Sequence, residues 1–293
     1  MVPKPDFRSV QARAARGGVF DDEVGAANAI AMTAGDTGVM PVYADEVVVL
    51  RAAPLGEADR IITLFGRERG MVRAVARGVR RTSSKFGARL EPFNVVDVQL
   101  YTRNFRNRSG LETVTQAVTV HPLAAKIVAD YEAYTAAAVV VESAMQLLTE
   151  TPAPNQWVLL VGALRDLAAQ DHPAQLVMGG YLLRSLALAG WQPSFNECAR
   201  CGAPGPHARI SYSAGGAVCD ACAIAVGATV AADIDVMRHL WALLAGNRGV
   251  QLSADTAVRE RAGDIAIAYA EHHLEHSLRA TRIADAARRH GAN

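Results

Sequence analysis

The sequence predicts an α+β protein in which an N-terminal five-stranded β-barrel precedes an α-helical domain with an inserted four-cysteine zinc module. Three observations support this fold class. Apolar and polar residues alternate in short segments between residues 43 and 120, apolar residues recur at helical spacing after Pro122, and the four cysteines form two Cys-x2-Cys pairs. With 293 residues, 51 % of them hydrophobic, the chain can form two domains with a sizeable core.

Residues 1–42 are rich in alanine, glycine and charged residues and show no sustained strand or helix periodicity. Such a segment buries too little apolar surface to offset the entropy lost on ordering. We expect either a disordered extension or a stretch upstream of a working start near Met40. The first residues contain no apolar h-region, so we expect no secretory signal, and no apolar run approaches the roughly 20 residues that cross a membrane. We therefore expect a cytoplasmic protein, in which paired cysteines hold metal more often than they form disulfides.

Five short strands are predicted in the barrel region. The alternation is clearest after residue 95, where Val96, Val98 and Leu100 share one face and polar residues the other. Because a closed barrel leaves no strand edge exposed, it suits five short strands better than an open sheet does. The predicted strands are Val47–Leu50, Arg60–Phe65, Met71–Ala76, Val95–Arg103 and Leu111–Val120.

The pattern becomes helical after Pro122, where apolar residues recur every three or four positions up to Leu148. Further helices are predicted over residues 155–170, 173–189, 233–245 and 255–287. We expect a helical domain in two parts, residues 121–195 and 225–293, separated by the cysteine segment at residues 196–224.

The cysteines have the spacing of a four-thiolate zinc site. Cys198 and Cys201 form one pair, and Cys219 and Cys222 form the second pair after seventeen intervening residues. Each pair places two thiolates on one edge of a tetrahedron, and no cysteine is left over. Because catalytic zinc keeps an open coordination position, the spacing favours one structural Zn2+ ion, with a redox dithiol or an iron–sulfur cluster as alternatives.

No enzyme constellation is found. His273-Leu274-Glu275 resembles part of the nucleobase-deaminase motif, but it follows the cysteines instead of preceding them. His272 and His276 have the spacing of a metal pair but lie on a polar helix face. The chain has no phosphate-binding P-loop, no nucleophile elbow and no His-Glu-x-x-His motif. We therefore expect a protein without catalytic residues.

Charge is distributed unevenly along the chain. Between residues 67 and 108, eleven basic and three acidic residues give a net charge of +8, so the remainder carries −7 of the overall +1. Arginines that neutralise phosphates, together with aromatic residues that stack on bases, are typical of single-strand binding. Phe86 and Phe93 can instead be core residues, and Phe105 is a weaker stacking candidate. The predicted DNA-binding residues are Arg73, Arg77, Arg80, Arg81, Lys85, Arg89, Tyr101, Arg103, Arg106 and Arg108.

Four segments in this region resemble the N-terminal signature of the bacterial recombination mediator family RecO. They are Leu55–Ile62 (LGEADRII), Arg69–Val72 (RGMV), Ala76–Arg81 (ARGVRR) and Ser84–Phe93 (SKFGARLEPF). The resemblance extends over about residues 43–289. This sequence departs from the family pattern in its N-terminal extension and in a longer, more basic loop at Thr102–Gly110.

The resemblance implies an OB-fold DNA-binding domain at residues 43–120, a helical C-terminal domain and a zinc module. It also implies a non-enzymatic DNA repair and recombination function in the nucleoid-associated cytoplasm. Members bind single- and double-stranded DNA, anneal complementary strands and help to load RecA onto DNA coated by the single-stranded-DNA-binding protein SSB. They act with RecR and contact the acidic C-terminal tail of SSB, for which Arg165 and Arg184 are candidates here. The alternative is an interaction scaffold of zinc ribbon and barrel that binds nucleic acid only weakly.

Overall fold

The computed structural model describes residues 42–84, 86–102, 110–227 and 229–281. The predicted extension, apart from Val42, lies outside these residues. The same is true of five residues of the predicted nucleic-acid interface: Lys85, Arg103, Phe105, Arg106 and Arg108.

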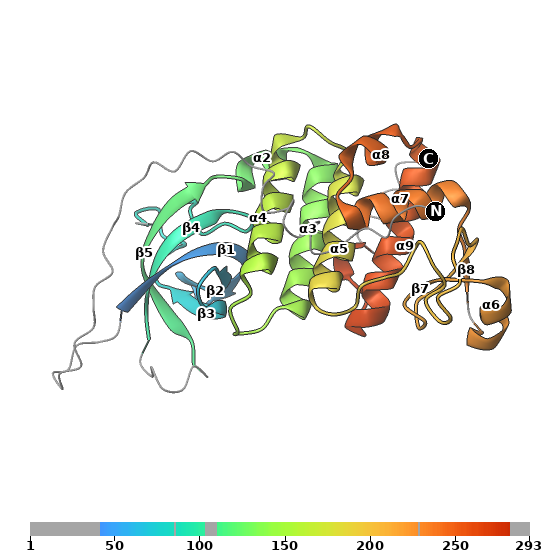
Figure 1. The fold of residues 1–293 in the computed structure, drawn as a ribbon. Coiled ribbons are helices and arrows are strands. Elements are labelled where there is room, and N and C mark those ends of the chain that lie inside the picture. The colour runs from blue at the N-terminus through green and yellow to red at the C-terminus, as the bar shows by residue number, and fades with distance from the viewer. Residues whose placement is uncertain (1–41, 85, 103–109, 228, 282–293) are drawn as a thin grey trace, which may run out of the picture. The chain divides into compact units, whose positions relative to one another are not determined.

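Five strands form a closed barrel (Figure 1). They are β1 (Val42–Leu55), β2 (Asp59–Gly66), β3 (Gly70–Ala76), β4 (Val95–Tyr101) and β5 (Glu112–His121). Their order around the barrel is β1-β2-β3-β5-β4, with β4 closing on β1; β3 and β5 are parallel, and all other neighbours are antiparallel. The predicted five-stranded barrel is confirmed, and its strand order is that of an OB-fold.

Strand β1 is apolar on both faces because it separates two cores. Val47 and Val49 point into the barrel, where they pack with residues such as Leu64. Val48 and Leu50 point outward into the core that the barrel shares with the helices. An uninterrupted apolar run is the pattern expected of a strand buried on both sides.

The connection between β3 and β4, residues 77–94, closes the barrel core. Val79, Phe86 and Leu90 are buried among the inward-facing strand residues. Phe93 is also buried, in the core shared with the helices. Phe86 and Phe93 are therefore core residues and do not form a surface for base stacking.

The helical region follows the barrel in the chain (green to red in Figure 1). Helices α3, α4, α5, α7 and α9 enclose an apolar core that includes Leu160, Leu183 and Tyr269. No helix in the described part of the chain is long and apolar enough to cross a membrane. The helices are α2 (Ala124–Ala129), α3 (Tyr131–Leu147), α4 (Pro154–Ala169), α5 (Ala174–Leu188), α6 (Asp220–Val226), α7 (Ile234–Ala245), α8 (Arg248–Ser253) and α9 (Thr256–Leu274).

The helical pattern after Pro122 divides into two helices, and one helix prediction was wrong in its extent. The helical pattern at residues 123–148 forms two helices, because Asp130 adopts extended backbone and caps α3 by accepting a hydrogen bond from the Ala133 amide. The helix predicted over residues 255–287 ends at Leu274, where Glu275 takes a left-handed conformation (φ 55°).

A strand prediction was also too long: β4 ends at Tyr101, and Arg103 lies outside the described residues. Strands β6 (Arg209–Ser211), β7 (Gly216–Val218) and β8 (Val230–Ala231) were not predicted. They form a small sheet in the order β7-β6-β8. Such strands of two or three residues are too short to show a periodic pattern.

Candidate nucleic-acid interface and metal centre

The arginine loop, residues 77–81, is fixed to the barrel by its backbone. The Gly78 amide donates to Asp59 Oδ1 at 2.8 Å, and the Arg80 amide donates to the carbonyl of Ala58 at 3.0 Å. Gly78 has a φ of 65°, which glycine adopts at little cost. With Val79 inserted into the barrel core, Arg77, Arg80 and Arg81 are left exposed at the surface.

Strand register places Arg73 and Tyr101 on the same outer face of the barrel. Tyr101 on β4 lies opposite Thr113 on β5, and Thr113 lies opposite Val75 on β3. Side chains at paired positions point to the same face of a sheet, and residues two apart on a strand share that face. Arg73, two residues before Val75, therefore shares the face of Tyr101, which is half-buried, and the exposed Arg77 follows directly after the end of β3.

The exposed arginines have few electrostatic partners. Within the described ranges, Arg73, Arg77, Arg80 and Arg81 take part in no ion pair. The Arg80 guanidinium donates to the carbonyl of Gly56 at 3.2 Å. Because a local excess of like charge destabilises a fold, an arrangement of this kind is favourable when a polyanion is bound.

The remaining basic candidates lie in different settings. Arg89 is exposed and donates to the carbonyl of Phe86 at 3.4 Å. In the helical domain Arg165 is exposed on α4, whereas Arg184 on α5 is half-buried and donates to the Gly180 carbonyl at 2.9 Å. Burial lowers the pKa of Arg184, and the neighbouring Arg248 lowers it further.

The four cysteines converge as their spacing predicts. Their Sγ atoms all lie within 4.8 Å of one another, and the Cys201 and Cys219 Sγ atoms are 3.9 Å apart. A tetrahedron with metal–sulfur distances of about 2.3 Å has edges of about 3.8 Å, whereas a disulfide requires about 2.05 Å. The geometry therefore fits a four-thiolate metal site, and all four thiols are free.

Two backbone turns present these thiols. Gly202 has a φ of 72°, and its amide donates to the carbonyl of Cys198 at 2.8 Å, which closes the turn of the first pair. Cys219 is the N-cap of α6, so the second pair lies at a helix start, where backbone amides favour thiolates.

The Cys198 thiol has an environment that favours its charged form. Hydrogen bonding from the Cys219 backbone amide, assisted by those of Cys201 and Arg200, lowers the pKa of Cys198 to about 6. The pKa of Cys222 is raised, first by its side-chain hydrogen bond with Cys219. A bound divalent cation favours deprotonation of all four thiols, as thiolate coordination requires.

The cysteine segment is joined to the helical core. Ile210 and Ala217 from its small sheet, together with Phe195, are buried among the helix residues. Tyr212 contacts Tyr269 of α9 edge to face, with ring centroids 6.3 Å apart. The His272 ring of α9 also contacts the Tyr212 ring, with ring centroids 6.2 Å apart. In the described part of the chain, the four cysteines are the one cluster of potential metal ligands.

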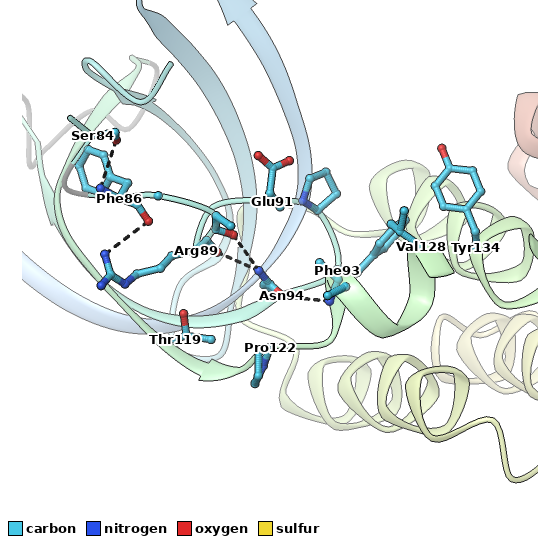
Figure 2. Close-up of a pocket in the computed structure, with 15 residues that line it drawn as sticks. Ser84, Phe86, Arg89, Glu91, Phe93, Asn94, Thr119, Pro122, Val128 and Tyr134 are labelled. Atoms are coloured by element: carbon cyan, nitrogen blue, oxygen red, sulfur yellow. Dashed lines mark hydrogen bonds between the residues drawn. The ribbon is translucent and has the colours of Figure 1, made fainter. Parts of the chain in front are cut away.

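The sequence did not predict a pocket of about 950 Å3 between the end of the barrel and helix α2. We call it the α2 pocket (Figure 2). Its walls come from residues 84, 86–89 and 91–94, from the end of β5 and from helices α2 and α3. No local pattern marks it, because its lining residues are separated by up to fifty positions and meet only in the folded chain. They include Ser84, Arg89, Pro92, Phe93, Asn94, Pro122, Ala125, Val128 and Tyr134.

Two sequence models of known protein families match this chain, one over the barrel and one over the helical region. Residues 40–123 match the sequence model described as Recombination protein O N terminal, and residues 128–282 match Recombination protein O C terminal. The two matches together cover most of the chain.

Individual relatives extend over almost the same region. The DNA repair protein RecO of Frankia casuarinae is 49 % identical over 243 residues, which is 82 % of this chain and 97 % of the relative. The DNA repair protein RecO of Streptomyces coelicolor is 46 % identical over 250 residues, 84 % of this chain and 100 % of the relative. That of Thermobifida fusca is 44 % identical over 255 residues, 85 % of this chain and all of the relative. The chain therefore belongs to the RecO family of DNA repair proteins.

Proposed function

We propose that this protein is a non-enzymatic recombination mediator that binds single- and double-stranded DNA and anneals complementary strands. The observation that carries the proposal is the group of exposed arginines without ion-pair partners in the described residues, on the barrel of a RecO family member. Arginines on this face neutralise phosphates and reduce the repulsion between two strands. Such contacts bind tightly, depend steeply on salt and read little sequence.

Arg80→Ala combined with Arg81→Ala tests this assignment. We expect DNA affinity to fall several-fold and the dependence of log affinity on log salt to flatten by about 1.4 for single strands, since each lost phosphate contact contributes about 0.7. Fluorescence anisotropy over a salt series measures both quantities. The matched control is Arg238→Ala with Arg259→Ala, which removes the same charge from α7 and α9. Equal affinity and slope for the two double variants would exclude the arginine loop as the interface.

The rival function is an interaction scaffold that binds nucleic acid weakly. Between residues 67 and 102, the described part of the chain carries seven arginines against three acidic residues, all in the barrel region, which favours the mediator over the scaffold. A nucleotide-free annealing assay with complementary strands separates the two functions: the mediator accelerates annealing, with and without SSB on the strands, and the scaffold does not.

We further propose that the protein helps to load RecA onto SSB-coated DNA together with RecR, in the cytoplasm at the nucleoid. The acidic C-terminal tail of SSB is then expected to contact the helical domain, with Arg165 and Arg184 as candidates. Replacing both by alanine should weaken binding of the SSB tail peptide in calorimetry while DNA affinity stays within twofold.

The proposed cofactor is one structural Zn2+ ion held by Cys198, Cys201, Cys219 and Cys222. The sulfur geometry supports a four-thiolate site with no open position. Elemental analysis should give one zinc per chain. Iron and inorganic sulfide in its place would establish the iron–sulfur alternative.

A further inference from the structure

The α2 pocket adjoins the arginine loop. Ser84 lines the pocket, and its amide donates to the carbonyl of Arg81 at 3.0 Å. Arg89, which is also exposed, lines the pocket from the same β3–β4 connection. A strand whose phosphates contact Arg81 is therefore within one short turn of the pocket.

The pocket walls are apolar and partly aromatic. Pro92 and Pro122 line it, and Val128 and Tyr134 contribute from α2 and α3, the side opposite Ser84 and Phe86 in Figure 2. Tyr134 is 45 % exposed, and its ring meets the buried Phe93 ring edge to face, at 6.0 Å between centroids. Planar apolar walls around an exposed ring suit a nucleobase, which stacks through its faces irrespective of sequence.

The pocket is held open by its own framework. Asn94 donates to the carbonyls of Ala88 and Arg89 and accepts the Ala124 amide at 2.9 Å, so it ties the β3–β4 connection to α2 (Figure 2). Phe93 has a φ of 78°, which is costly for a residue with a side chain. The Phe93 amide donates to the carbonyl oxygen of Val49 at 2.8 Å, and this hydrogen bond holds the conformation. A preformed pocket binds without the cost of ordering its walls.

The charge around the pocket favours an anionic occupant. Among the described residues that line the pocket, Glu91 is the one acidic residue, and its carboxylate is paired with Arg60 at 2.8 Å. Arg89 and the arginine loop supply the opposite charge. An occupant that combines apolar rings with a chain of negative charges is a single strand of nucleic acid.

We propose that the α2 pocket receives unpaired bases of a strand whose phosphates lie on the arginine loop. This inference rests on the proposed DNA binding. It adds a way for the protein to distinguish single strands from duplex DNA. Bases of a duplex are paired and stacked inside it, so they do not enter the pocket. The arginines then contribute to binding of both forms of DNA, and the pocket contributes to binding of single strands alone.

Tyr134→Ala tests the inference in the full-length protein. We expect a roughly 5- to 10-fold loss of affinity for a short oligothymidylate, at the lower end of what stacking on one base contributes. Affinity for a duplex of equal length should stay within twofold. Tyr134→Phe, which keeps the ring, should bind like the unmodified protein. The control is Tyr131→Ala, which removes another exposed tyrosine of α3 that does not line the pocket.

Two further measurements guard against a folding defect in Tyr134→Ala. Ala125→Phe adds a ring at an exposed lining position and should block the pocket, with the same selective loss. An oligonucleotide carrying 2-aminopurine should change its emission on binding the unmodified protein and much less on binding either pocket variant.

Equal losses for single strands and duplexes, or no loss in both Tyr134→Ala and Ala125→Phe, would overturn the base pocket. The second result would point to an apolar protein segment as the occupant. Neither result affects the arginine assignment, which the Arg80 and Arg81 variants test separately.

Discussion

The arginine loop and the cysteine segment differ in how they relate to the rest of the fold. The three arginines of the loop project from a barrel whose core is complete without them, and none of the three takes part in an ion pair within the described residues. The cysteines lie in a segment whose sheet is buried against the helices. Side chains that contribute little to the fold are available to a ligand, whereas a site that holds together a segment packed on the core contributes mainly to stability. The two regions should therefore respond to mutation in opposite ways.

The largest effect is expected from replacing Cys219 and Cys222 with serine. Loss of two thiolates should abolish metal binding and cost at least several kcal/mol of folding free energy, since metal binding and folding are coupled. Thermal unfolding and elemental analysis measure the two effects. DNA affinity of the remaining folded protein should change by less than twofold. A variant of normal stability that no longer binds DNA would reverse the roles assigned to the two regions.

A second change tests whether the cysteine segment must pack closely on the chain that precedes it. A Cβ atom added to Gly216 would lie 2.1 Å from the Ser194 carbonyl oxygen, so Gly216→Ala should destabilise the protein by about 2–4 kcal/mol. Gly215→Ala is the control, because Gly215 also has a positive φ but no atom within 4 Å of the added carbon. It should cost only about 1 kcal/mol in chemical denaturation. Similar losses of stability for the two variants would mean that the backbone conformation of these glycines, and not packing against Ser194, determines the effect.

A buried carboxyl group on β1 makes the stability of the fold depend on pH. Asp45 is 4 % exposed and accepts the Glu68 amide at 3.1 Å, and burial raises its pKa from 3.8 to about 6. The folded state thus holds this proton more tightly than the unfolded state, so stability is greatest below about pH 4 and falls as the pH rises to about 6.

Asp45→Asn cannot ionise, so it should be more stable than the unmodified protein by about 1–3 kcal/mol at neutral pH. The difference should vanish near pH 4. Denaturant unfolding across this pH range measures it, with the exposed Asp97→Asn as control. A constant difference at every pH would show that the ionisation of Asp45 is not its cause.

The smallest effect on stability is expected for Arg80→Ala with Arg81→Ala. Their side chains are exposed, and the backbone hydrogen bonds of the arginine loop are retained in the variant, so the free energy of unfolding should change by less than about 0.5 kcal/mol. The same variant should show the largest loss of DNA affinity. A large loss of stability would mean that these arginines support the fold and would remove the contrast between the two regions.

Local spacing along the chain was enough to predict the barrel strands, most of the helices, the cysteine cluster and the exposed arginine loop. Alternation fixes which face of β4 is buried, and two Cys-x2-Cys pairs converge with little dependence on their surroundings. The sequence pattern did not show that helices break at Asp130 and at Glu275, because each break depends on a single residue's backbone conformation within a continuous apolar pattern.

Only the tertiary structure decided which aromatic residues remain available for stacking. Phe86 and Phe93 occur among arginines in the sequence, yet their rings fill the core because the β3–β4 connection folds back over the barrel. Strand register brings Tyr101 into the same row as Val75, and Asn94 joins the β3–β4 connection to α2. The sequence by itself determined the chemistry of the metal ligands and of the basic surface. The α2 pocket depends on contacts between distant residues, and such contacts leave no periodic signal in the chain.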